Sequence, residues 1–348
     1  MQDVNKVAAP PAQSMAARLL EMIGASWMSQ AICVAAELGL ADLLTPGSRT
    51  ADDLARATGC ERTSVHRLLR ALASIGVCTE QEDGSFALAP MGFLLRADAQ
   101  PSVRSWAIWW GKYQWPEWGN LRHSVQTGES ARALLNGRNS YDFVAADPQA
   151  AEVFNRAMSE LTHLAATEVA RGYDFSAATR VVDIGGGRGE LLTTILSAYP
   201  ALRGTLFELP HAMAAAAALI GTAGVAQRCT LLTGDFFDSV PGGGDVYILK
   251  SVIHNWDDQR SAIILDNCRR SMTGNARLVL VERIMPARMT GIATDRAVTR
   301  SDLNMLVGIG GRERTESEFI SLLSSSGFKA ARIIRIGFEF SLIEAIPC

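Results

Sequence analysis

The chain has 348 residues, 48% of them hydrophobic and 20% charged, with a formal net charge of −3. These values predict a soluble globular protein with a sizeable core and favour two domains, and so small a charge gives no global attraction to nucleic acid or to an anionic membrane. The six cysteines are scattered without a C-x-x-C pair, so the sequence indicates neither a disulfide framework nor a zinc site and fits reduced thiols in the cytosol.

The N-terminal residues 1–16 are rich in Ala, Pro and Gln and predict a flexible tail. From Met15 to Leu44, apolar residues recur at helical spacing and are interrupted at Gly24 and Gly39, so we expect two or three helices with wide apolar faces. Polar residues break this stretch and no basic region precedes it, which argues against an export signal or a membrane span. We therefore expect a cytoplasmic protein without a membrane partner.

Two short helices and a hairpin follow. Thr50 is a suitable N-cap and Gly59 a suitable stop for the first helix, and a second helix carries an apolar face from Val65 to Ile75. Two short apolar runs flank Glu82-Asp83-Gly84, which predicts a β-hairpin. Helix, helix and hairpin together predict a winged-helix arrangement within an N-terminal domain of residues 17–100.

A winged helix can place its second helix in the DNA major groove, so a ligand-sensing, DNA-binding regulator is one interpretation. The exposed side of this helix offers a few cations close to acidic residues: Arg62, His66, Arg67 and Arg70 beside Glu61, Glu80, Glu82 and Asp83. Because no basic stripe results, we favour packing or dimerisation over nucleic-acid binding.

Residues 101–170 are expected to form a helical connector that contributes to a substrate pocket. Six aromatic residues lie between Trp106 and Trp118. Such clusters are most often core or interface, and contact between a ring such as Trp106 and a planar substrate is the alternative. The pattern then predicts a helix over 155–169, preceded by Phe154, with Met158 among its apolar residues and Thr162 near its middle.

A glycine-rich turn follows a short apolar strand over 180–184. Asp183 lies near the end of this strand, and glycines occupy positions 185, 186, 187 and 189. Glycines let a backbone turn sharply and let a ligand lie against it. A second strand ends at Glu208, about 20 residues further on, where a carboxylate can accept hydrogen bonds from both ribose hydroxyls. The order of these elements predicts a nucleotide site.

The spacing of the glycines indicates which nucleotide. In the dinucleotide fingerprint G-x-G-x-x-G, the pyrophosphate lies on the helix N-terminus. Here Glu190 stands where the last glycine would be, and its charge would repel a pyrophosphate. We therefore expect a cofactor with an adenosine but no phosphates. The segment Asp183–Gly189 resembles the first motif of S-adenosylmethionine-dependent methyltransferases; an ordinary tight strand-to-helix turn is the alternative.

From residue 171 to the C-terminus, strands and helices alternate. We expect strands at 180–184, 204–208, 228–232, 244–250, 277–284, 330–336 and 338–345. Strands that alternate with helices predict an α/β fold with a Rossmann-like, doubly wound sheet, whose ligands bind at the carboxyl ends of the strands.

Several chemically capable side chains occur at these ends. Asp235 can accept a hydrogen bond from an adenine amino group, and Phe236 can cover the ring, although a loop cap explains the acid equally well. The fourth strand ends at Lys250 and leads to His254. We expect the fifth strand to end at Glu282, and Glu313 precedes a late helix, so both acids can converge on His254.

Four segments together resemble the small-molecule O-methyltransferases of the plant caffeate and isoflavone type and their bacterial natural-product relatives. These segments are Asp183–Gly189, Leu249–Trp256, Val281–Arg283 and Gly311–Thr315. The similarity extends over roughly residues 20 to 345. It implies that S-adenosylmethionine is the methyl donor and S-adenosylhomocysteine the product, that no metal is needed, and that the N-terminal domain forms a homodimer and closes part of the partner's acceptor pocket.

The resemblance also implies a role for each matching residue. His254 is the general base, oriented by Glu282 and Glu313. Cofactor contacts fall on Asp183, Gly185, Gly187, Glu208, Asp235, Phe236, Lys250 and Thr162. The pocket for the small-molecule acceptor falls on Phe154, Met158, Asn304 and Met305, with Trp106 as a further candidate.

Two departures from the family pattern matter. Many members read His-Asp-Trp where this chain reads His254-Asn255-Trp256, so any role of that acid is missing here. The segment between Asp302 and Gly310 is one residue shorter than in the plant enzymes, which affects the placement of Asn304 and Met305.

The expected reaction is a direct displacement, in which His254 deprotonates a hydroxyl that attacks the sulfonium methyl group. A phenol titrates near pH 10 by analogy with tyrosine, so it needs such a base at neutral pH. N- or C-methylation, and family members that use S-adenosylmethionine for hydroxylation or decarboxylation, remain open alternatives, as do the identity of the acceptor and the choice between Glu282 and Glu313 as partner of His254.

Overall fold

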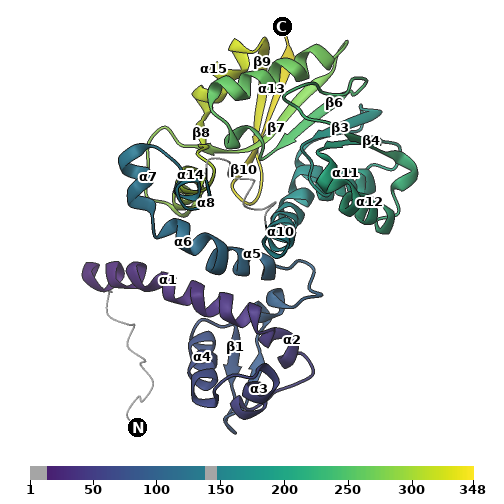
Figure 1. Cartoon of the computed structure of the whole chain (residues 1–348). Helices are drawn as coiled ribbons and strands as arrows, with labels where there is room; N and C mark the ends of the chain where they lie inside the picture. The colour runs from purple at the N-terminus through teal and green to yellow at the C-terminus, as the bar shows by residue number, and fades with distance from the viewer. Residues whose placement is uncertain (1–13, 138–146) are drawn as a thin grey trace, which may run out of the picture. The chain divides into compact units, whose positions relative to one another are not determined.

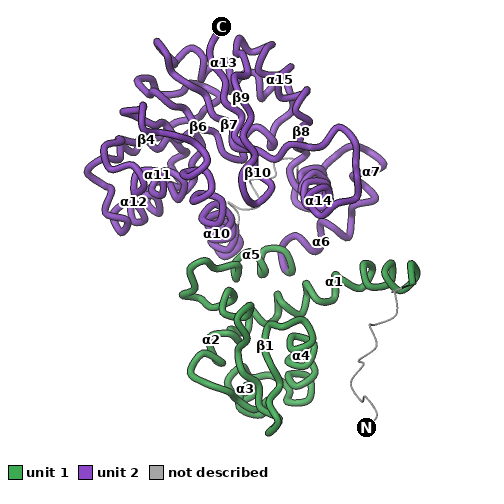
Figure 2. The backbone as a smooth tube through the Cα atoms, turned by 180° about the vertical axis from the view of Figure 1, so that it is seen from behind, with its two compact units in different colours: residues 1–111 green, residues 112–348 purple. Residues whose placement is uncertain are grey.

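The computed structural model describes residues 14–137 and 147–348, so residues 1–13 of the expected tail lie outside the described part. It divides into two compact units, residues 1–111 and 112–348 (Figure 2). The division falls inside the segment expected to be a connector.

The first unit begins with helix α1, Met15–Glu37, which the Ser14 side chain caps at its N-terminus. The expected break at Gly24 was wrong, because the helix continues through it. Glycine in a helix interior costs only about 1 kcal/mol, and apolar residues on both sides favour continuation. The break at Gly39 is confirmed: its φ of 65° ends α1, and α2, Leu40–Leu44, follows.

The remaining elements of the first unit follow the expected order. Thr50 caps α3, Ala51–Thr58, which ends at left-handed Gly59, and α4 spans Arg62–Ser74. Strands β1, Cys78–Glu80, and β2, Phe86–Leu88, pair antiparallel as the expected hairpin. A 3-10 turn, Pro90–Leu95, and helix α5, Arg104–Ile108, complete the unit.

One face of α1 stays exposed within this unit. Its large apolar side chains Leu19, Leu20, Ile23 and Trp27 are 59–71% exposed. The helix is long and apolar enough to cross a membrane by length and composition alone, with a mean hydropathy of 1.4 and 17% of that window buried. A large exposed apolar face on a helix marks an interaction surface.

The second unit is an α/β structure built on a mixed sheet (Figure 1). The main strands are β3 Arg180–Ile184, β4 Arg203–Glu208, β5 Cys229–Thr233, β6 Val246–Lys250, β7 Arg277–Met285, β9 Phe328–Arg335 and β10 Phe340–Pro347. Their order in the sheet is β5-β4-β3-β6-β7-β10-β9, and the short strand β8, Arg314–Thr315, pairs with the end of β7. All expected strands are present, and β10 runs antiparallel to both neighbours.

Helices cover both faces of this sheet: α10 Pro148–Gly172, α11 Glu190–Ala198 and α12 Met213–Thr222 on one face, and α13 Asp258–Ser271 and α15 Glu316–Ser325 on the other. The short helices α6 Trp115–Trp118, α7 Leu121–Thr127 and α8 Ala131–Asn136 pack with α14 Ala293–Gly308. A π-helical turn, Trp109–Gln114, precedes α6. The helix expected over 155–169 is longer at both ends: it begins at Pro148, where Asp147 caps it, and continues to Gly172.

Alternation along the strands separates two cores. Val181 and Val281 pack with residues of α10 and α11, whereas the next residue of β3, Val182, and the preceding one of β7, Leu280, pack with residues of α13 and α15. Because successive side chains of a strand point to opposite faces, Asp183 and Lys250 are directed to the α10 face and Glu282 to the α13 face.

The chain reverses its direction across the sheet at β3. Strands β4 and β5 extend to one side of β3, and β6 then pairs with its other side. Ligands of doubly wound sheets bind at the carboxyl ends of strands at such a switch point. The glycine turn after β3 and Lys250 at the end of β6 both lie at this point.

Candidate active site

The glycine turn is shaped by left-handed backbone and by close packing. Gly185 and Gly187 have φ values of 66° and 59°, which side chains rarely adopt. Gly186, which the sequence did not single out as a site residue, has the least room: a Cβ there would lie 2.4 Å from Asp183 Oδ2. The turn therefore holds its shape only with glycine at all three positions.

Asp183 and Glu208 place two carboxylates beside this turn. Glu208 accepts a hydrogen bond from the Gly187 amide at 2.9 Å, which ties the end of β4 to the turn. Asp183 is 1% exposed, and neither of its carboxylate oxygens has a hydrogen-bond partner among the described residues. Burial, helped by the charge of Glu208, raises the pKa of Asp183 to about 7. A buried acid without partners is suited to bind a cationic group of a ligand.

Lys250 faces α10, as the alternation along β6 requires. Its Nζ donates to Thr162 Oγ1 at 3.2 Å and lies 5.2 Å from the centre of the Phe340 ring. Burial, with a contribution from the charge of Arg283, lowers the pKa of Lys250 to about 8. The structure thus brings Thr162 and Lys250 together from segments far apart in the sequence.

Asp235 and Phe236 follow β5 on the other side of the turn. Asp235 Oδ1 accepts from the Phe237 amide at 2.8 Å, so this acid does cap its own loop. Phe236 lies beside the turn, because a Cβ on Gly185 would be 3.4 Å from its ring. Asn267 donates to the carbonyl oxygens of Phe236 and Phe237 and holds the loop to α13. Acid, aromatic ring and glycine turn are therefore neighbours.

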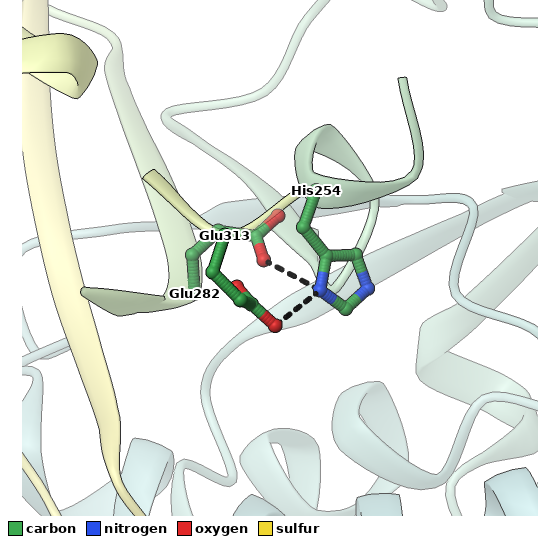
Figure 3. A group of neighbouring side chains, drawn as sticks. All are labelled: His254, Glu282 and Glu313. Carbon is green, nitrogen blue, oxygen red and sulfur yellow. Dashed lines mark hydrogen bonds and ion pairs between the residues drawn. The ribbon is translucent and has the colours of Figure 1, made fainter. Parts of the chain in front are cut away.

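His254 lies in a single 3-10 turn, Ile253–Asn255, after β6 and is 7% exposed. Its Nδ1 lies 3.1 Å from Glu313 Oε1, within hydrogen-bond distance, and 3.8 Å from Glu282 Oε2 (Figure 3). Both carboxylates thus approach the same ring nitrogen. Nε2 is left for another partner.

Glu282 does not end its strand as expected, because β7 continues to Met285. Neighbouring β8 pairs with these extra residues, and such pairing is not visible in a local sequence pattern. Glu282 Oε1 accepts from the backbone amides of Val252 and Ile253 at 3.1 and 2.8 Å. Burial raises the pKa of Glu282. This acid therefore supports the backbone before His254 as well as facing its ring.

Glu313 is the hydrogen-bond partner of His254. Its Oε1 also accepts from Ser301 Oγ at 2.6 Å, and its backbone amide donates to Asp302 at 2.9 Å. Burial favours the neutral acid, but His254 and the bond from Ser301 outweigh it, so the pKa of Glu313 is lowered. Ser301 and Asp302 were not identified from the sequence, because only the fold brings α14 to Glu313.

The charges around His254 determine its protonation. Burial disfavours the imidazolium, but the charges of Glu282 and Glu313 outweigh burial, and the pKa of His254 is raised. A raised pKa makes the ring a stronger base. It also means that the neutral, proton-accepting form becomes predominant only at a higher pH than for an ordinary histidine.

The donor atoms of His254, Glu282 and Glu313 lie within 4.8 Å of one another, a spacing that a metal ion could use. Hydrogen bonds already engage part of this set: Glu282 Oε1 has two backbone donors, and Glu313 Oε1 has Ser301 and the histidine. These bonds favour an oriented histidine over a metal centre.

The expected pocket residues lie on two helix faces. Phe154, Met158 and Thr162 are spaced by four residues along α10, so the first two continue the face that carries Thr162. Asn304 and Met305 follow Ser301 by three and four residues in α14, so all three lie on the same face of this helix.

Trp118 Nε1 donates to Asn304 Oδ1 at 3.3 Å, a contact that the sequence did not indicate. Trp106 belongs to the first unit, where its ring packs edge-on against Trp110 with centroids 5.7 Å apart.

Two family models match the chain. One, described as an O-methyltransferase domain, matches residues 118–329, and the other, described as an O-methyltransferase dimerisation domain, matches residues 20–98. The first covers more than half of the chain and includes the glycine turn, His254 and both glutamates.

Individual relatives match over almost their full length. A phenazine O-methyltransferase from Lysobacter antibioticus is 41% identical and covers 100% of both chains, and a mitomycin biosynthesis 6-O-methyltransferase from Streptomyces lavendulae is 40% identical, covering 91% of this chain and 90% of the relative.

Solved structures match equally well. The crystal structure of LaPhzM has a TM-score of 0.91 and 41% identity, covering 96% of this chain and 100% of that one. The neocarzinostatin-biosynthesis O-methyltransferase NcsB1, solved in complex with S-adenosylmethionine and 2-hydroxy-5-methyl naphthoic acid, has a TM-score of 0.77 and 31% identity, covering 92% of this chain and 96% of that one. Together with the arrangement around the glycine turn and His254, these matches show that the chain belongs to the S-adenosylmethionine-dependent O-methyltransferase family.

Proposed function

We propose that this enzyme methylates a phenolic hydroxyl of a small aromatic natural product, with His254 as the general base. The observation that carries the proposal is the buried histidine whose Nδ1 faces Glu313 at 3.1 Å, because this contact leaves Nε2 available to a substrate. Buried acid–base pairs with shifted pKa values at strand ends are typical of catalytic sites.

The residues around the glycine turn fit S-adenosylmethionine. A side chain at Gly186 would collide with Asp183, and the buried Asp183 carboxylate, whose oxygens have no hydrogen-bond partner among the described residues, suits an ammonium group. Glu208 would hold the ribose hydroxyls, and Asp235 and Phe236 the adenine. Lys250 and Thr162, already in contact, would hold the carboxylate. When bound, the cofactor supplies an electrophilic methyl group on sulfur.

His254 would take the proton of the acceptor hydroxyl at Nε2. With Glu313 accepting from Nδ1–H, the neutral ring keeps its lone pair on Nε2, and the imidazolium that forms is stabilised by the charges of Glu313 and Glu282. Such general-base assistance typically contributes about 10²–10⁴-fold. Holding the acceptor in line contributes further, and Phe154, Met158 and Met305 would do this by packing against a planar ring.

The exposed apolar face of α1 lies within the segment that matches the dimerisation domain. We propose that this face is buried in a homodimer of a cytoplasmic enzyme. Burial against a second copy accounts for the apolar character of α1 without a membrane or nucleic acid.

One experiment tests the function directly. Purified enzyme is incubated with S-adenosylmethionine and a panel of phenols, naphthols, hydroxyphenazines and their amino analogues, and release of S-adenosylhomocysteine is measured. Mass spectrometry and NMR then locate the new methyl group. We expect methylation at a ring hydroxyl; methylation only at nitrogen or carbon, or turnover that forms no methylated product, would refute the proposal.

A further inference from the structure

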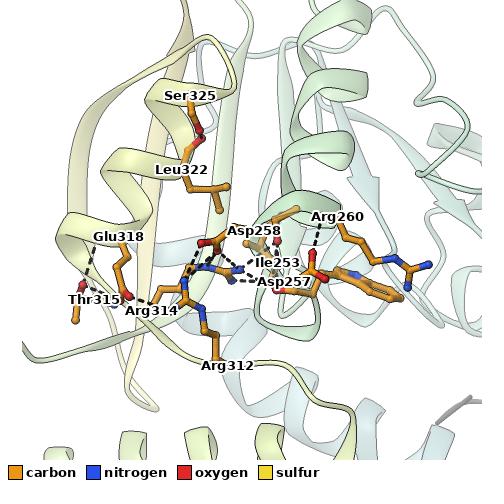
Figure 4. A network of polar contacts seen from close by, with 12 residues as sticks. Ile253, Asp257, Asp258, Arg260, Arg312, Arg314, Thr315, Glu318, Leu322 and Ser325 are labelled. Carbon is orange, nitrogen blue, oxygen red and sulfur yellow. Dashed lines mark hydrogen bonds and ion pairs between the residues drawn. The ribbon is translucent and has the colours of Figure 1, made fainter. Parts of the chain in front are cut away.

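Arg314, at the start of β8, is a fully buried arginine next to the candidate base, with 0% of its surface exposed. Its Nη1 donates to the carbonyl of Ile253 at 3.0 Å and its Nη2 to the carbonyl of Trp256 at 2.8 Å (Figure 4). These two carbonyls lie before and after His254 in the chain. The guanidinium therefore forms hydrogen bonds with the backbone on both sides of His254.

The same guanidinium is anchored to α13. Nε and Nη2 donate to Asp258 Oδ1 at 3.0 and 2.8 Å, and Nη2 also lies 3.4 Å from Ser261 Oγ. Asp258 is the first residue of α13. The planar fork of an arginine can make such divergent bonds at once, whereas a lysine offers a single point charge.

The residues beside Arg314 hold the histidine as well. The Arg312 amide donates to the His254 carbonyl at 2.9 Å, and Glu313 binds the ring. Gly311 passes so close that a Cβ would lie 2.1 Å from the His254 carbonyl oxygen. Residues 311–314 therefore contact the backbone and the ring of His254 and the carbonyl groups on either side of it.

The histidine turn depends on contacts with other elements. It is a 3-10 turn of three residues without a side-chain cap, and it follows Ser251, a non-glycine residue with a φ of 53°. A backbone in this region persists only where its surroundings hold it. Glu282 binds the amides before His254, and Ser261 Oγ lies 3.4 Å from each of the two carbonyls that Arg314 binds. Arg314 makes the shorter, charge-assisted bonds to these carbonyls.

We propose that Arg314 is a positioning residue for catalysis: by fixing the carbonyls on both sides of His254, it keeps Nδ1 on Glu313 and directs Nε2 to the acceptor. The proposal rests on His254 being the base. It predicts that loss of the guanidinium slows methyl transfer while leaving the cofactor site, on the α10 face of the sheet, unchanged.

Arg270 supplies a control. It lies on α13, its side chain is 70% exposed, and it forms an ion pair with Asp266 of the same helix. Arg314→Gln, Arg314→Lys and Arg270→Gln are compared with wild type for kcat, KM, S-adenosylhomocysteine affinity by calorimetry and the pH dependence of kcat.

We expect Arg314→Gln to lower kcat at least about tenfold, because small displacements of a catalytic group are costly. The acidic limb of its pH profile should move to lower pH, since His254 loses its close contact with Glu313. Cofactor affinity should stay within about twofold of wild type, Arg314→Lys should restore kcat only partly, and Arg270→Gln should behave as wild type.

Two results would overturn the proposal. One is an Arg314→Gln variant that is less stable to heat but keeps the wild-type kcat and acidic limb, since this would show a structural role only. The other is full activity of Arg314→Lys, which decides the case if the glutamine variant does not fold. A His254→Ala variant is assayed in parallel: if it is slow while the Arg314 variants are normal, only the positioning role fails, and if it is fast, the base assignment itself fails.

Discussion

Glu282 and Glu313 both face Nδ1 of His254, but they form different hydrogen bonds. Glu313 makes the hydrogen bond to Nδ1, whereas Glu282 also accepts from two backbone amides and stands 3.8 Å from the ring. The sequence left the choice between them open. The geometry makes Glu313 the direct partner and Glu282 a second negative charge that supports the turn.

The raised pKa of His254 gives the pH dependence a definite sign. Only the neutral ring can accept a proton, so kcat/KM should rise as pH increases through this raised pKa and fall below it. Glu313→Gln keeps an oxygen that can accept from Nδ1–H but removes the charge. We expect its acidic limb to move down by on the order of one pH unit, and kcat to fall because the imidazolium loses a stabilising charge.

A pH–rate profile of wild type, Glu313→Gln and Glu316→Gln checks this. Glu316 is exposed in the first turn of α15 and serves as the control. An acidic limb that is identical in all three enzymes would show that Glu313 does not set the pKa of the base.

The residues around His254 could be predicted only in part from the sequence. His254, Glu282 and Glu313 were identified through their resemblance to a family pattern, and the structure brings them together. Ser301, Asp302 and Arg314 were not identified, because their partners lie in other elements and no local pattern marks them.

The glycine turn shows which structural features the sequence could indicate and which it could not. Its four glycines and the strand, turn and helix around it were evident, and β3 and α11 lie as expected. The room at each glycine depends on packing, which the sequence does not show. Gly186 abuts Asp183 and Leu206, whereas a Cβ on Gly187 would meet nothing within 4 Å.

Gly186→Ala is therefore predicted to weaken cofactor binding at least about tenfold, because the new methyl group must displace the Asp183 carboxylate. Gly221→Ala is the matched control, since a Cβ there meets nothing within 4 Å inside helix α12, and it should bind normally and unfold at the same or a slightly higher temperature. Calorimetry with S-adenosylhomocysteine measures both. Equal affinities of the two variants would mean that Asp183 does not contact the cofactor.

Element boundaries were the weaker part of the prediction. The strands matched within a few residues because alternating and buried apolar runs are strong signals. Gly24 did not end α1, and β7 ran past Glu282. At Gly24 the residues on both sides outweighed the cost of one glycine, whereas at Glu282 the pairing of β7 with β8 outweighed the local signal.

The exposed face of α1 bears on the oligomeric state of the enzyme. Leu20 and Ile23 are 68% and 63% exposed in a segment that matches a dimerisation domain. We expect the wild type to have twice the mass of the 37.4 kDa chain in light scattering, and Leu20→Glu/Ile23→Glu to be monomeric, because burying two charges in an apolar interface is unfavourable. Ile263→Glu, at a residue 44% exposed on α13, is the control and should remain dimeric. A double variant that stays dimeric would locate the interface elsewhere.

The central claim is that His254 removes the proton of the acceptor, and single-turnover methyl transfer tests it most directly. Enzyme saturated with S-adenosylmethionine is mixed with the best acceptor of the panel, and the rate of methylated product is followed for wild type, His254→Ala and His66→Ala. His66 is half-exposed in the first unit, so its variant is the control. We predict that His254→Ala slows the step by about 10²–10⁴-fold while binding S-adenosylhomocysteine with wild-type affinity. Methyl transfer at the wild-type rate in His254→Ala would contradict the account.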